Sequence, residues 1–202
     1  MTPRLVLLRH GRTAWNATGR FQGQADPPLD DVGVAQARAA GARLAPLRPW
    51  SILSSDLARA QVTAEIIAAA CHAAGDAGPN LLVDPALREV ALGDWEGLDD
   101  DEARRRFPDE HARWRAEPWP TRRRGGGETE AEAGARVAAA VLTGLSGVPH
   151  GATLIVVSHG LALRAAMAAL GGTGIAPHLG NGQWLTIPAP SSPARRATLV
   201  SR

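Results

Sequence analysis

Two of the six histidines in this sequence stand in matching contexts. His10 follows the apolar run Leu5–Leu8 and Arg9, His159 follows the apolar run Leu154–Val157 and a serine, and a glycine comes after each histidine. A neutral imidazole is a competent nucleophile that can carry a phosphoryl group. A single histidine after a strand is more often a turn residue or a structural hydrogen-bond partner. Two in the same context, one beside an arginine, favour a chemical role.

Three charged side chains complete a set that suits phosphoryl chemistry. Arg9 and Arg59 carry guanidinium groups, which grip phosphate with a two-pronged fork. Arg59 falls in the first turn of an expected helix, the unfavourable end of the helix dipole for a cation, and an anion bound there would explain it. Glu89 is able to protonate a leaving oxygen. Taken alone, it would more commonly be a solvated surface carboxylate.

The apolar runs before His10 and His159 are typical of strands buried on both faces of a parallel sheet. Ligands of such sheets bind outside the carboxyl ends of the strands, so both histidines would share a pocket if their strands are neighbours. Strands alternate with helical patterns along the chain. This alternation predicts an α/β fold, a three-layer α/β/α sandwich around a mostly parallel sheet, as a single domain over residues 1–202.

The other elements follow from local patterns. Asp30 is a good N-cap for a helix that ends near Ala45, Ser54–Asp56 are capping types before the Arg59 helix, and Thr129–Glu132 is a capping box. Residues 13–29 form a long loop that is too polar to be buried, and Glu89 follows a strand-like segment. Further strands are expected at Trp50–Leu53, Leu81–Val83, Gln183–Ile187 and Ala197–Val200, and a last helix at Leu161–Leu170.

Residues 99–127 differ from their surroundings and are interpreted as an inserted helical cap within the domain. Prolines punctuate the segment, and Trp114, Trp119 and Arg122–Arg124 either line the entrance to the site or serve as packing and surface. Arg104–Arg106 lie beside an acidic run, and the net charge is only +2. These features favour a solvated face, so no nucleic acid is expected as a partner.

Composition excludes several other chemistries. Every basic residue apart from histidine is arginine, so there is no Walker, Schiff-base or general-base lysine. The sequence has no zinc-like Cys/His spacing, and we expect no metal and no cofactor. The single cysteine, Cys71, indicates a core position and a reducing, cytoplasmic location. No stretch is long and apolar enough to span a membrane, and the start lacks a signal-peptide pattern.

Taken in order, five motifs of the chain resemble those of the histidine phosphatase superfamily, the cofactor-dependent phosphoglycerate mutase-like proteins. The resemblance extends from Leu5 to about Ile187 and implies the phosphoglycerate mutase-like fold. The motifs are Leu8–Asn16, Gly23–Leu29, Ser54–Ala60, Leu87–Glu89 with Gly93–Gly97, and Ser158–Gly160.

The resemblance also implies roles for these residues. His10 would become a phosphohistidine, and Glu89 would protonate the leaving group and then activate water. Arg9, Arg59 and His159 would hold the phosphoryl group. Contacts to phosphate or substrate would come from Asn16, Gln22, Gly23 and Gly160.

Within the superfamily, the alternatives are a phosphatase and a mutase. The mutases carry His-Tyr-Gly after the glutamate and Gly-Trp in the earlier loop, whereas here Val90 follows Glu89 and Gln24 follows Gly23. These differences look like the phosphatase branch, with most similarity to glucosyl-3-phosphoglycerate phosphatases and other sugar-acid phosphatases. We therefore expect a metal-independent phosphomonoesterase acting on a small phosphorylated metabolite.

Two alternatives stay open at this stage. One is mutase-type phosphoryl transfer, and the other is a regulatory module that binds phosphate without turnover. An exposed Trp184 on a late edge strand would make a homodimer plausible.

Overall fold

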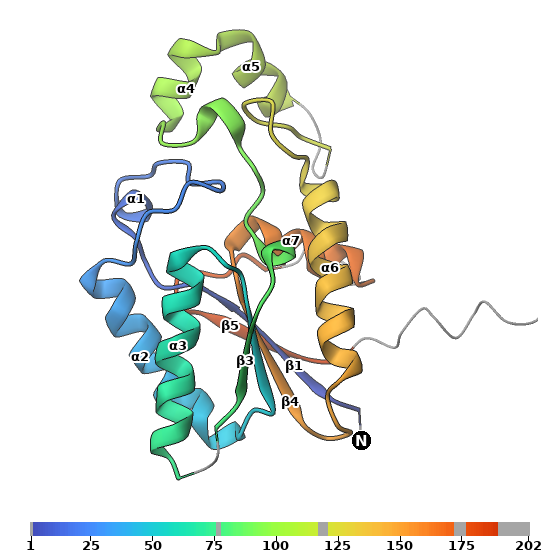
Figure 1. Cartoon of the computed structure of the whole chain (residues 1–202). Coiled ribbons are helices and arrows are strands. Elements are labelled where there is room, and N and C mark those ends of the chain that lie inside the picture. Colours follow the sequence, from blue (N-terminus) through green and yellow to red (C-terminus); the bar gives the residue numbers. More distant parts are fainter. Residues whose placement is uncertain (1, 76–77, 117–120, 172–176, 190–202) are drawn as a thin grey trace, which may run out of the picture.

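The chain folds around one five-stranded sheet, flanked by helices on both faces (Figure 1). The structure is a computed structural model that describes residues 2–75, 78–116, 121–171 and 177–189. The strands are β1 (Arg4–Arg9), β2 (Ser51–Ser54), β3 (Asn80–Val83), β4 (Thr153–Ser158) and β5 (Trp184–Pro188). The helices are α1 (Ala14–Ala17), α2 (Asp31–Leu44), α3 (Ala58–Ala73), α4 (Asp100–Arg106), α5 (Pro108–Ala116), α6 (Glu130–Ser146) and α7 (Gly160–Ala169).

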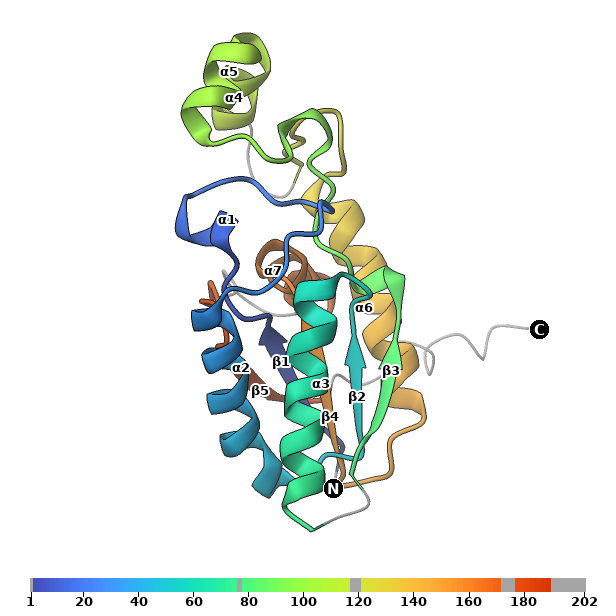
Figure 2. The same cartoon turned by 60° about the vertical axis from the view of Figure 1, so that its left-hand side comes forward.

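The strand order is β3-β2-β4-β1-β5, and every pairing is parallel except that of β5 with β1. The parallel strands run in one direction in Figure 2, so their carboxyl ends meet at one edge of the molecule. The central strands β1 and β4 are adjacent, with Arg9 opposite Ser158. The condition for the two histidines to share a pocket, that their strands are neighbours, is therefore met. The predicted, mostly parallel α/β fold is confirmed.

Two apolar cores lie on opposite faces of the sheet. One packs α2 and α3 against residues such as Val6 and Ile155, and the other packs α6 and α7 against residues such as Leu7 and Val156. Successive strand side chains point to opposite faces, which is why an uninterrupted apolar run serves both cores. Cys71 is buried in the first core, as its sequence context predicted.

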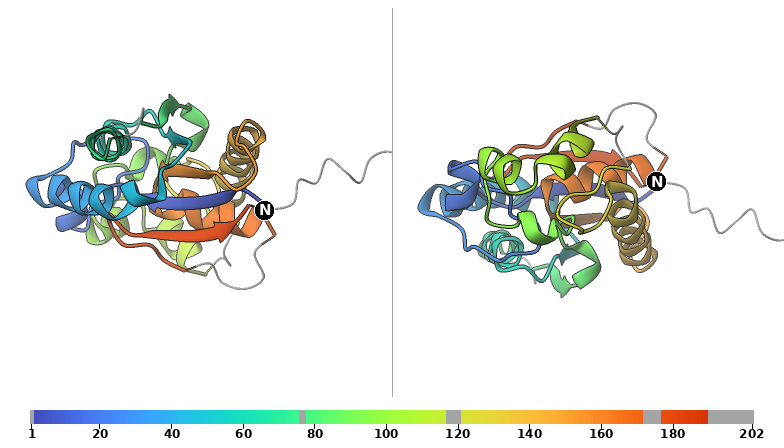
Figure 3. Two further views of the ribbon diagram at one scale, coloured as in Figure 1. Left: turned by 90° about the horizontal axis from the view of Figure 1, so that it is seen from below. Right: turned by 90° about the horizontal axis from the view of Figure 1, so that it is seen from above.

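Helices α4 and α5 lie beyond the carboxyl ends of the strands (Figures 1 and 3). A third cluster of buried residues lies beneath them, with Trp95 fully buried and Trp114 packed against it. Asp99 caps α4 and Thr129 caps α6, each through the reciprocal pair of hydrogen bonds of a capping box. A capped helix therefore begins at the start of the 99–127 segment, and another begins just after its end.

The structure corrects three local expectations. The segment before Glu89 is a short 3-10 turn, Pro85–Leu87, because Pro85 has no N–H for a strand ladder and Asp84 caps the turn. The N-cap of α3 is Leu57 and has no side-chain cap bond, whereas Asp26 of the preceding loop accepts the Ala58 N–H. Residues 13–29 are not one exposed loop. They contain the short helix α1, and Gln22 is buried with its side-chain oxygen accepting from the Thr13 hydroxyl.

Some expectations fall outside the described residues. These are the strand expected at 197–200 and the position of Trp119. In the described part of the chain, no helix combines the length and hydropathy needed to cross a bilayer.

Candidate active site

The two histidines lie side by side at the carboxyl ends of β1 and β4. Their ring centroids are 5.0 Å apart with the planes tilted by 59°. Both side chains are almost fully excluded from solvent, with His10 2% and His159 0% exposed. The site therefore places a pair of imidazoles where chemistry in an α/β sheet is expected.

The ring of His10 is oriented for nucleophilic attack. Its Nδ1 lies 2.6 Å from the carbonyl oxygen of Gly11, which only accepts hydrogen bonds, so Nδ1 carries the hydrogen. Burial, followed by the charges of Arg59 and Arg9, holds the pKa of His10 well below its ordinary value. His10 is thus neutral near pH 7, with its lone pair on Nε2.

His159 has the complementary arrangement. Its Nε2 is 2.9 Å from the hydroxyl of Ser55, which also accepts the N–H of Leu57 at 3.3 Å. Among the described residues, Nε2 is the one acceptor within reach of the Ser55 hydroxyl hydrogen, so we assign that hydrogen bond as donated by Ser55. The ring hydrogen is then on Nδ1, a buried atom with no partner in this part of the chain. Burial and the neighbouring charge of Arg59 hold the pKa of His159 well below its ordinary value, so His159 is a neutral donor.

Buried Arg59 and half-buried Arg9 lie beside the imidazoles. Arg59 is 1% exposed and donates to the carbonyls of Ala25 at 2.6 Å and Gly23 at 2.8 Å, while Arg9 donates to the carbonyl of Leu179 at 2.9 Å. The Nε atom of each is buried without a partner in the described part of the chain. Unsatisfied buried donors are costly, and two cationic ones beside the Nδ1–H of His159 form a site for an anion.

Glu89 reaches the same site from the turn after β3. Its carboxylate accepts the N–H groups of Ala162 at 2.8 Å and Leu161 at 3.3 Å, in the first turn of α7, and that of Val90 at 2.9 Å. The N-terminus of a helix favours a negative charge. The side chain is half-buried, so the interpretation of Glu89 as a solvated surface carboxylate is wrong.

Glu96 holds the loop that faces Arg59, a role that the sequence motif alone did not reveal. Its carboxylate accepts the N–H groups of Gln24 at 2.8 Å, Ala25 at 2.9 Å and Leu92 at 3.0 Å. Gly23 has φ +52°, and a Cβ there would collide with the Glu96 carboxylate. The loop is thus held from two sides: Arg59 donates to its carbonyl groups, and Glu96 accepts from its N–H groups.

One cavity of about 170 Å³ joins these groups. Every predicted site residue lines it except His159, which packs against His10. Its walls are Arg9, His10, Asn16, Arg20, Phe21, Gln22, Gly23, Arg59, Glu89, Leu92, Gly160, Leu161 and His178. Sequence reasoning missed Arg20, Phe21, Leu92, Leu161 and His178. The first two adjoin Gln22 and could have been found, whereas nothing around His178 marks it.

Comparison with known proteins agrees with this geometry. Residues 5–185 match the model of the histidine phosphatase superfamily (branch 1). The chain belongs to this superfamily. A probable phosphoglycerate mutase GpmB of Yersinia pestis is 37% identical over 169 residues, 82% of this chain and 74% of that protein.

Solved structures of phosphatases in the superfamily are similar as well. The mycobacterial glucosyl-3-phosphoglycerate phosphatase in complex with VO3 has a TM-score of 0.79 and 33% identity, covering 91% of this chain and 90% of that one. The α-ribazole phosphatase of Shigella flexneri has a TM-score of 0.77 and 26% identity, covering 91% and 89%. The superfamily consists of enzymes, and these structural neighbours are phosphatases.

Among the described cap residues, Trp114 and Arg122–Arg124 do not line the cavity. Trp114 packs edge-on against Trp95, with ring centroids 5.5 Å apart. Arg124 is buried and donates to Glu130 at 2.7 Å. Of the two interpretations of these side chains, packing is therefore correct for Trp114 and Arg124.

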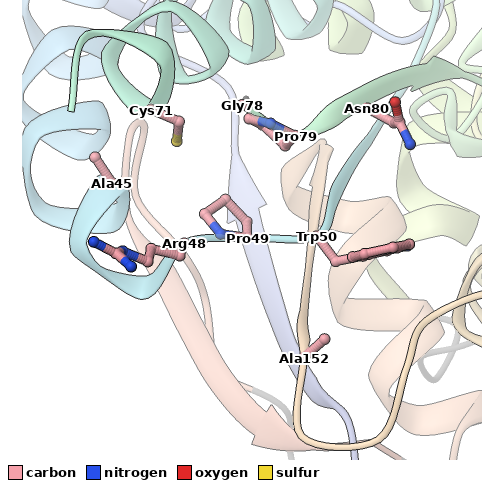
Figure 4. Close-up of a pocket in the computed structure, with 9 residues that line it drawn as sticks. All are labelled: Ala45, Arg48, Pro49, Trp50, Cys71, Gly78, Pro79, Asn80 and Ala152. Carbon is pink, nitrogen blue, oxygen red and sulfur yellow. The ribbon is translucent and has the colours of Figure 1, made fainter. Parts of the chain in front are cut away.

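A larger cavity, of about 490 Å³, lies at the opposite end of the sheet (Figure 4). Its walls include Trp50, Asn80 and Ala152, which stand at or just before the first residues of β2, β3 and β4. Arg48 is the only charged residue in this lining, and no nucleophile is paired with a base there. The chemistry of its lining, rather than its volume, makes the smaller cavity the candidate active site.

Among the described residues, no three histidine, cysteine or acidic side chains are grouped to hold a metal ion. The prediction of metal-independent catalysis is a question for experiment.

Proposed function

We propose that this protein is a metal-independent phosphomonoesterase that hydrolyses a small phosphorylated metabolite through a phosphohistidine at His10. The observation that carries the proposal is the neutral His10, fixed through Nδ1 and surrounded by the unpartnered donors of Arg9, Arg59 and His159. A nucleophile inside a preformed anion site is the arrangement that phosphoryl transfer requires.

In the first half-reaction, the lone pair of His10 Nε2 attacks phosphorus and the ester P–O bond breaks. The guanidinium groups of Arg9 and Arg59 and the Nδ1–H of His159 stabilise the charge on the non-bridging oxygens. Glu89, in its protonated form, gives its proton to the leaving oxygen, so the alcohol departs neutral. The N–H groups of Leu161 and Ala162 then receive the carboxylate that remains.

In the second half-reaction, the Glu89 carboxylate takes a proton from water as the water oxygen attacks the phosphohistidine. The P–N bond breaks, its electron pair returns to His10 Nε2, and inorganic phosphate is released. His10 and Glu89 recover their starting protonation states, so the cycle is balanced without any other reactant.

The cavity size supports a small substrate. Ligand pockets for drug-sized molecules occupy roughly 300–1,000 Å³. The cavity of about 170 Å³ is smaller, so it holds the phosphoryl group and its immediate attachment. Arg20 and His178 line its wall beside the anion site and suit a second anionic or hydroxylated part of the substrate. These features, with the similarity to a glucosyl-3-phosphoglycerate phosphatase, favour a sugar or sugar-acid phosphate.

The test is release of phosphate from a panel of phosphorylated metabolites in the presence of a chelator. The panel includes glucosyl-3-phosphoglycerate, 3-phosphoglycerate, sugar phosphates and an aryl phosphate. Release that resists the chelator and is abolished by His10→Ala is expected. Release that needs an added metal, or persists in His10→Ala, would contradict the proposal.

A second candidate is phosphoglycerate mutase activity, which the 37% identity to a probable mutase favours. Interconversion of phosphoglycerates after addition of bisphosphoglycerate, without net phosphate release, would establish it. Binding of phosphate with no turnover of any substrate would instead indicate the regulatory module.

We also propose that residues 1–202 form one domain in which 99–127 is a cap over the site. Arg20 in the cavity wall donates to Glu102 of α4 at 2.8 Å, and Leu92 belongs both to the cavity wall and to the cluster beneath the cap. The cytoplasmic location suggested by the lone buried Cys71 is part of the same proposal.

A homodimer is also a proposal. Trp184 lies on the edge strand β5 but is half-buried, with the guanidinium of Arg43 5.1 Å from its ring centroid. Sedimentation of the wild type against Trp184→Ala tests it: a dimer that Trp184→Ala dissociates is expected.

A further inference from the structure

Arg136, on the second turn of α6, holds the turn that carries Glu89. Its guanidinium donates to three carbonyls of that turn, those of Ala86 at 2.8 Å, Arg88 at 2.7 Å and Glu89 at 2.8 Å. The segment after β3 runs beside the N-terminal half of α6 (Figures 1 and 2). Between the 3-10 turns at Pro85–Leu87 and Gly93–Trp95, residues 88–92 form no helix or strand, so the Arg136 side chain fixes much of their path.

Glu128 completes the attachment from the glycine-rich loop before α6. Its two carboxylate oxygens accept from Arg136 at 2.8 and 2.7 Å, and one of them also accepts the Ala91 N–H at 3.0 Å. The Glu128 N–H in turn donates to the Ala91 carbonyl at 2.9 Å. Partial burial opposes ionisation of Glu128, but the hydrogen bonds from Arg136 and Ala91 prevail and lower the pKa of its carboxyl. The pair is therefore charged at neutral pH and binds the turn on both sides of Glu89.

We infer that Glu128 and Arg136 are positioning residues that set the Glu89 carboxyl at the leaving-group oxygen. Neither residue lines the cavity, so each acts through Glu89. The inference rests on the proposed function, because it assigns a purpose to the acid of that reaction. A misplacement of about 1 Å in a catalytic group is able to cost about 100-fold in rate.

A merely structural role for this pair would lower stability and reduce turnover of all substrates alike. A positioning role gives a leaving-group signature, because aryl phosphates leave without protonation whereas alkyl phosphates need the acid. The parameter to compare is kcat/KM, which covers steps up to departure of the leaving group and excludes activation of water.

The test measures kcat/KM of Arg136→Met and Glu128→Gln with an aryl phosphate and with the best alkyl phosphate of the panel. We expect a loss of about 10- to 100-fold for the alkyl ester and less than about threefold for the aryl ester. Arg136→Lys keeps the charge but cannot reach three carbonyls at once, so it should show a smaller loss with the same selectivity. Arg104→Met is the control, because Arg104 is an exposed arginine that pairs with Asp101 on α4, away from the Glu89 turn.

The same variants are then combined with Glu89→Gln. If Arg136 acts through Glu89, Arg136→Met should add no further loss for the alkyl ester in this background. Equal losses for both esters, or a full additional loss in the double variant, would overturn the positioning role. If Glu89→Gln itself lacks leaving-group selectivity, the acid role in the proposed function fails. If Glu89→Gln shows that selectivity and Arg136→Met does not, only the positioning role fails.

Discussion

The two buried histidines of the candidate active site, His10 and His159, should make the stability of this protein depend steeply on pH between about 7 and 5. In the unfolded chain, a histidine takes up a proton as pH falls through about 6.5. In the folded protein, burial and the charge of Arg59 lower the pKa of both His10 and His159, so they stay neutral. The unfolded state then binds more protons, and the free energy of unfolding falls as the solution is acidified.

The magnitude follows from this proton difference. Each histidine that stays neutral in the fold costs up to about 1.9 kcal/mol of stability between pH 7 and pH 5, and the two together cost up to about 3.8 kcal/mol. For a chain of this size, that corresponds to a fall in Tm of roughly 8–15 °C. Carboxylates whose pKa is lowered, such as Asp56 and Glu128, lose their contribution only as pH falls through about 4. They therefore lie outside the window.

The assay is denaturant unfolding in phosphate-free buffers across this range, followed by tryptophan fluorescence. His10→Asn keeps a donor for the Gly11 carbonyl and His159→Gln keeps a partner for Ser55, so each removes one titrating ring with little repacking. Each variant should lose about half of the pH dependence, whereas His178→Asn, at an exposed histidine, should leave it unchanged. A wild-type stability that is flat from pH 7 to pH 5, or undiminished dependence in both variants, would refute the argument that these rings are buried and neutral.

Three further predictions concern the groups around the anion. Arg59→Lys keeps the charge but loses the paired hydrogen bonds to the Gly23 and Ala25 carbonyls, so kcat/KM should fall by about 100- to 1,000-fold in the phosphate-release assay. A loss of less than about tenfold would show that these paired hydrogen bonds are not needed. Gly23→Ala should lower the free energy of unfolding by about 1–3 kcal/mol, because Gly23 has a positive φ and the Glu96 carboxylate leaves no room for a Cβ atom. The control is Gly19→Ala, which has a similar φ but open space around it and should lose less stability. Equal losses in the two variants would show that the contact with Glu96 is not the cause. Glu96→Gln leaves at least one N–H group of the loop without an acceptor, so the free energy of unfolding should fall by about 1–3 kcal/mol. Inhibition by inorganic phosphate should also weaken, and unchanged inhibition would show that Glu96 does not support the anion site.

The sequence was most informative where one physical rule acts locally. The apolar runs before His10 and His159 predict buried parallel strands, and the polar residues after them predict the site at their carboxyl ends. The capping box at Thr129 likewise begins α6 where expected. These features depend on residues that are neighbours in the chain, so the pattern is visible without the fold.

The missed features depend on contacts between distant segments. Asp56 looks like a helix cap, but in the fold Arg88 binds its carboxylate and Asp26 takes over at the start of α3. The loop around Gln22 reads as polar and exposed, but Arg59 satisfies its carbonyls inside the protein. Ser55 became a partner of His159 for the same reason, because the carboxyl ends of β2 and β4 meet.

Detection of phosphohistidine in Glu89→Gln tests directly whether His10 is the nucleophile of this enzyme. Because this variant cannot activate water, it should accumulate the phosphoenzyme formed from an aryl phosphate. Rapid quenching at alkaline pH, followed by peptide mass spectrometry, locates the phosphoryl group. We expect acid-labile phosphate on His10 in amounts approaching one per chain, and none in the double variant with His10→Ala. Turnover by the wild type with no phosphohistidine in Glu89→Gln, or with the phosphoryl group on another residue, would contradict it.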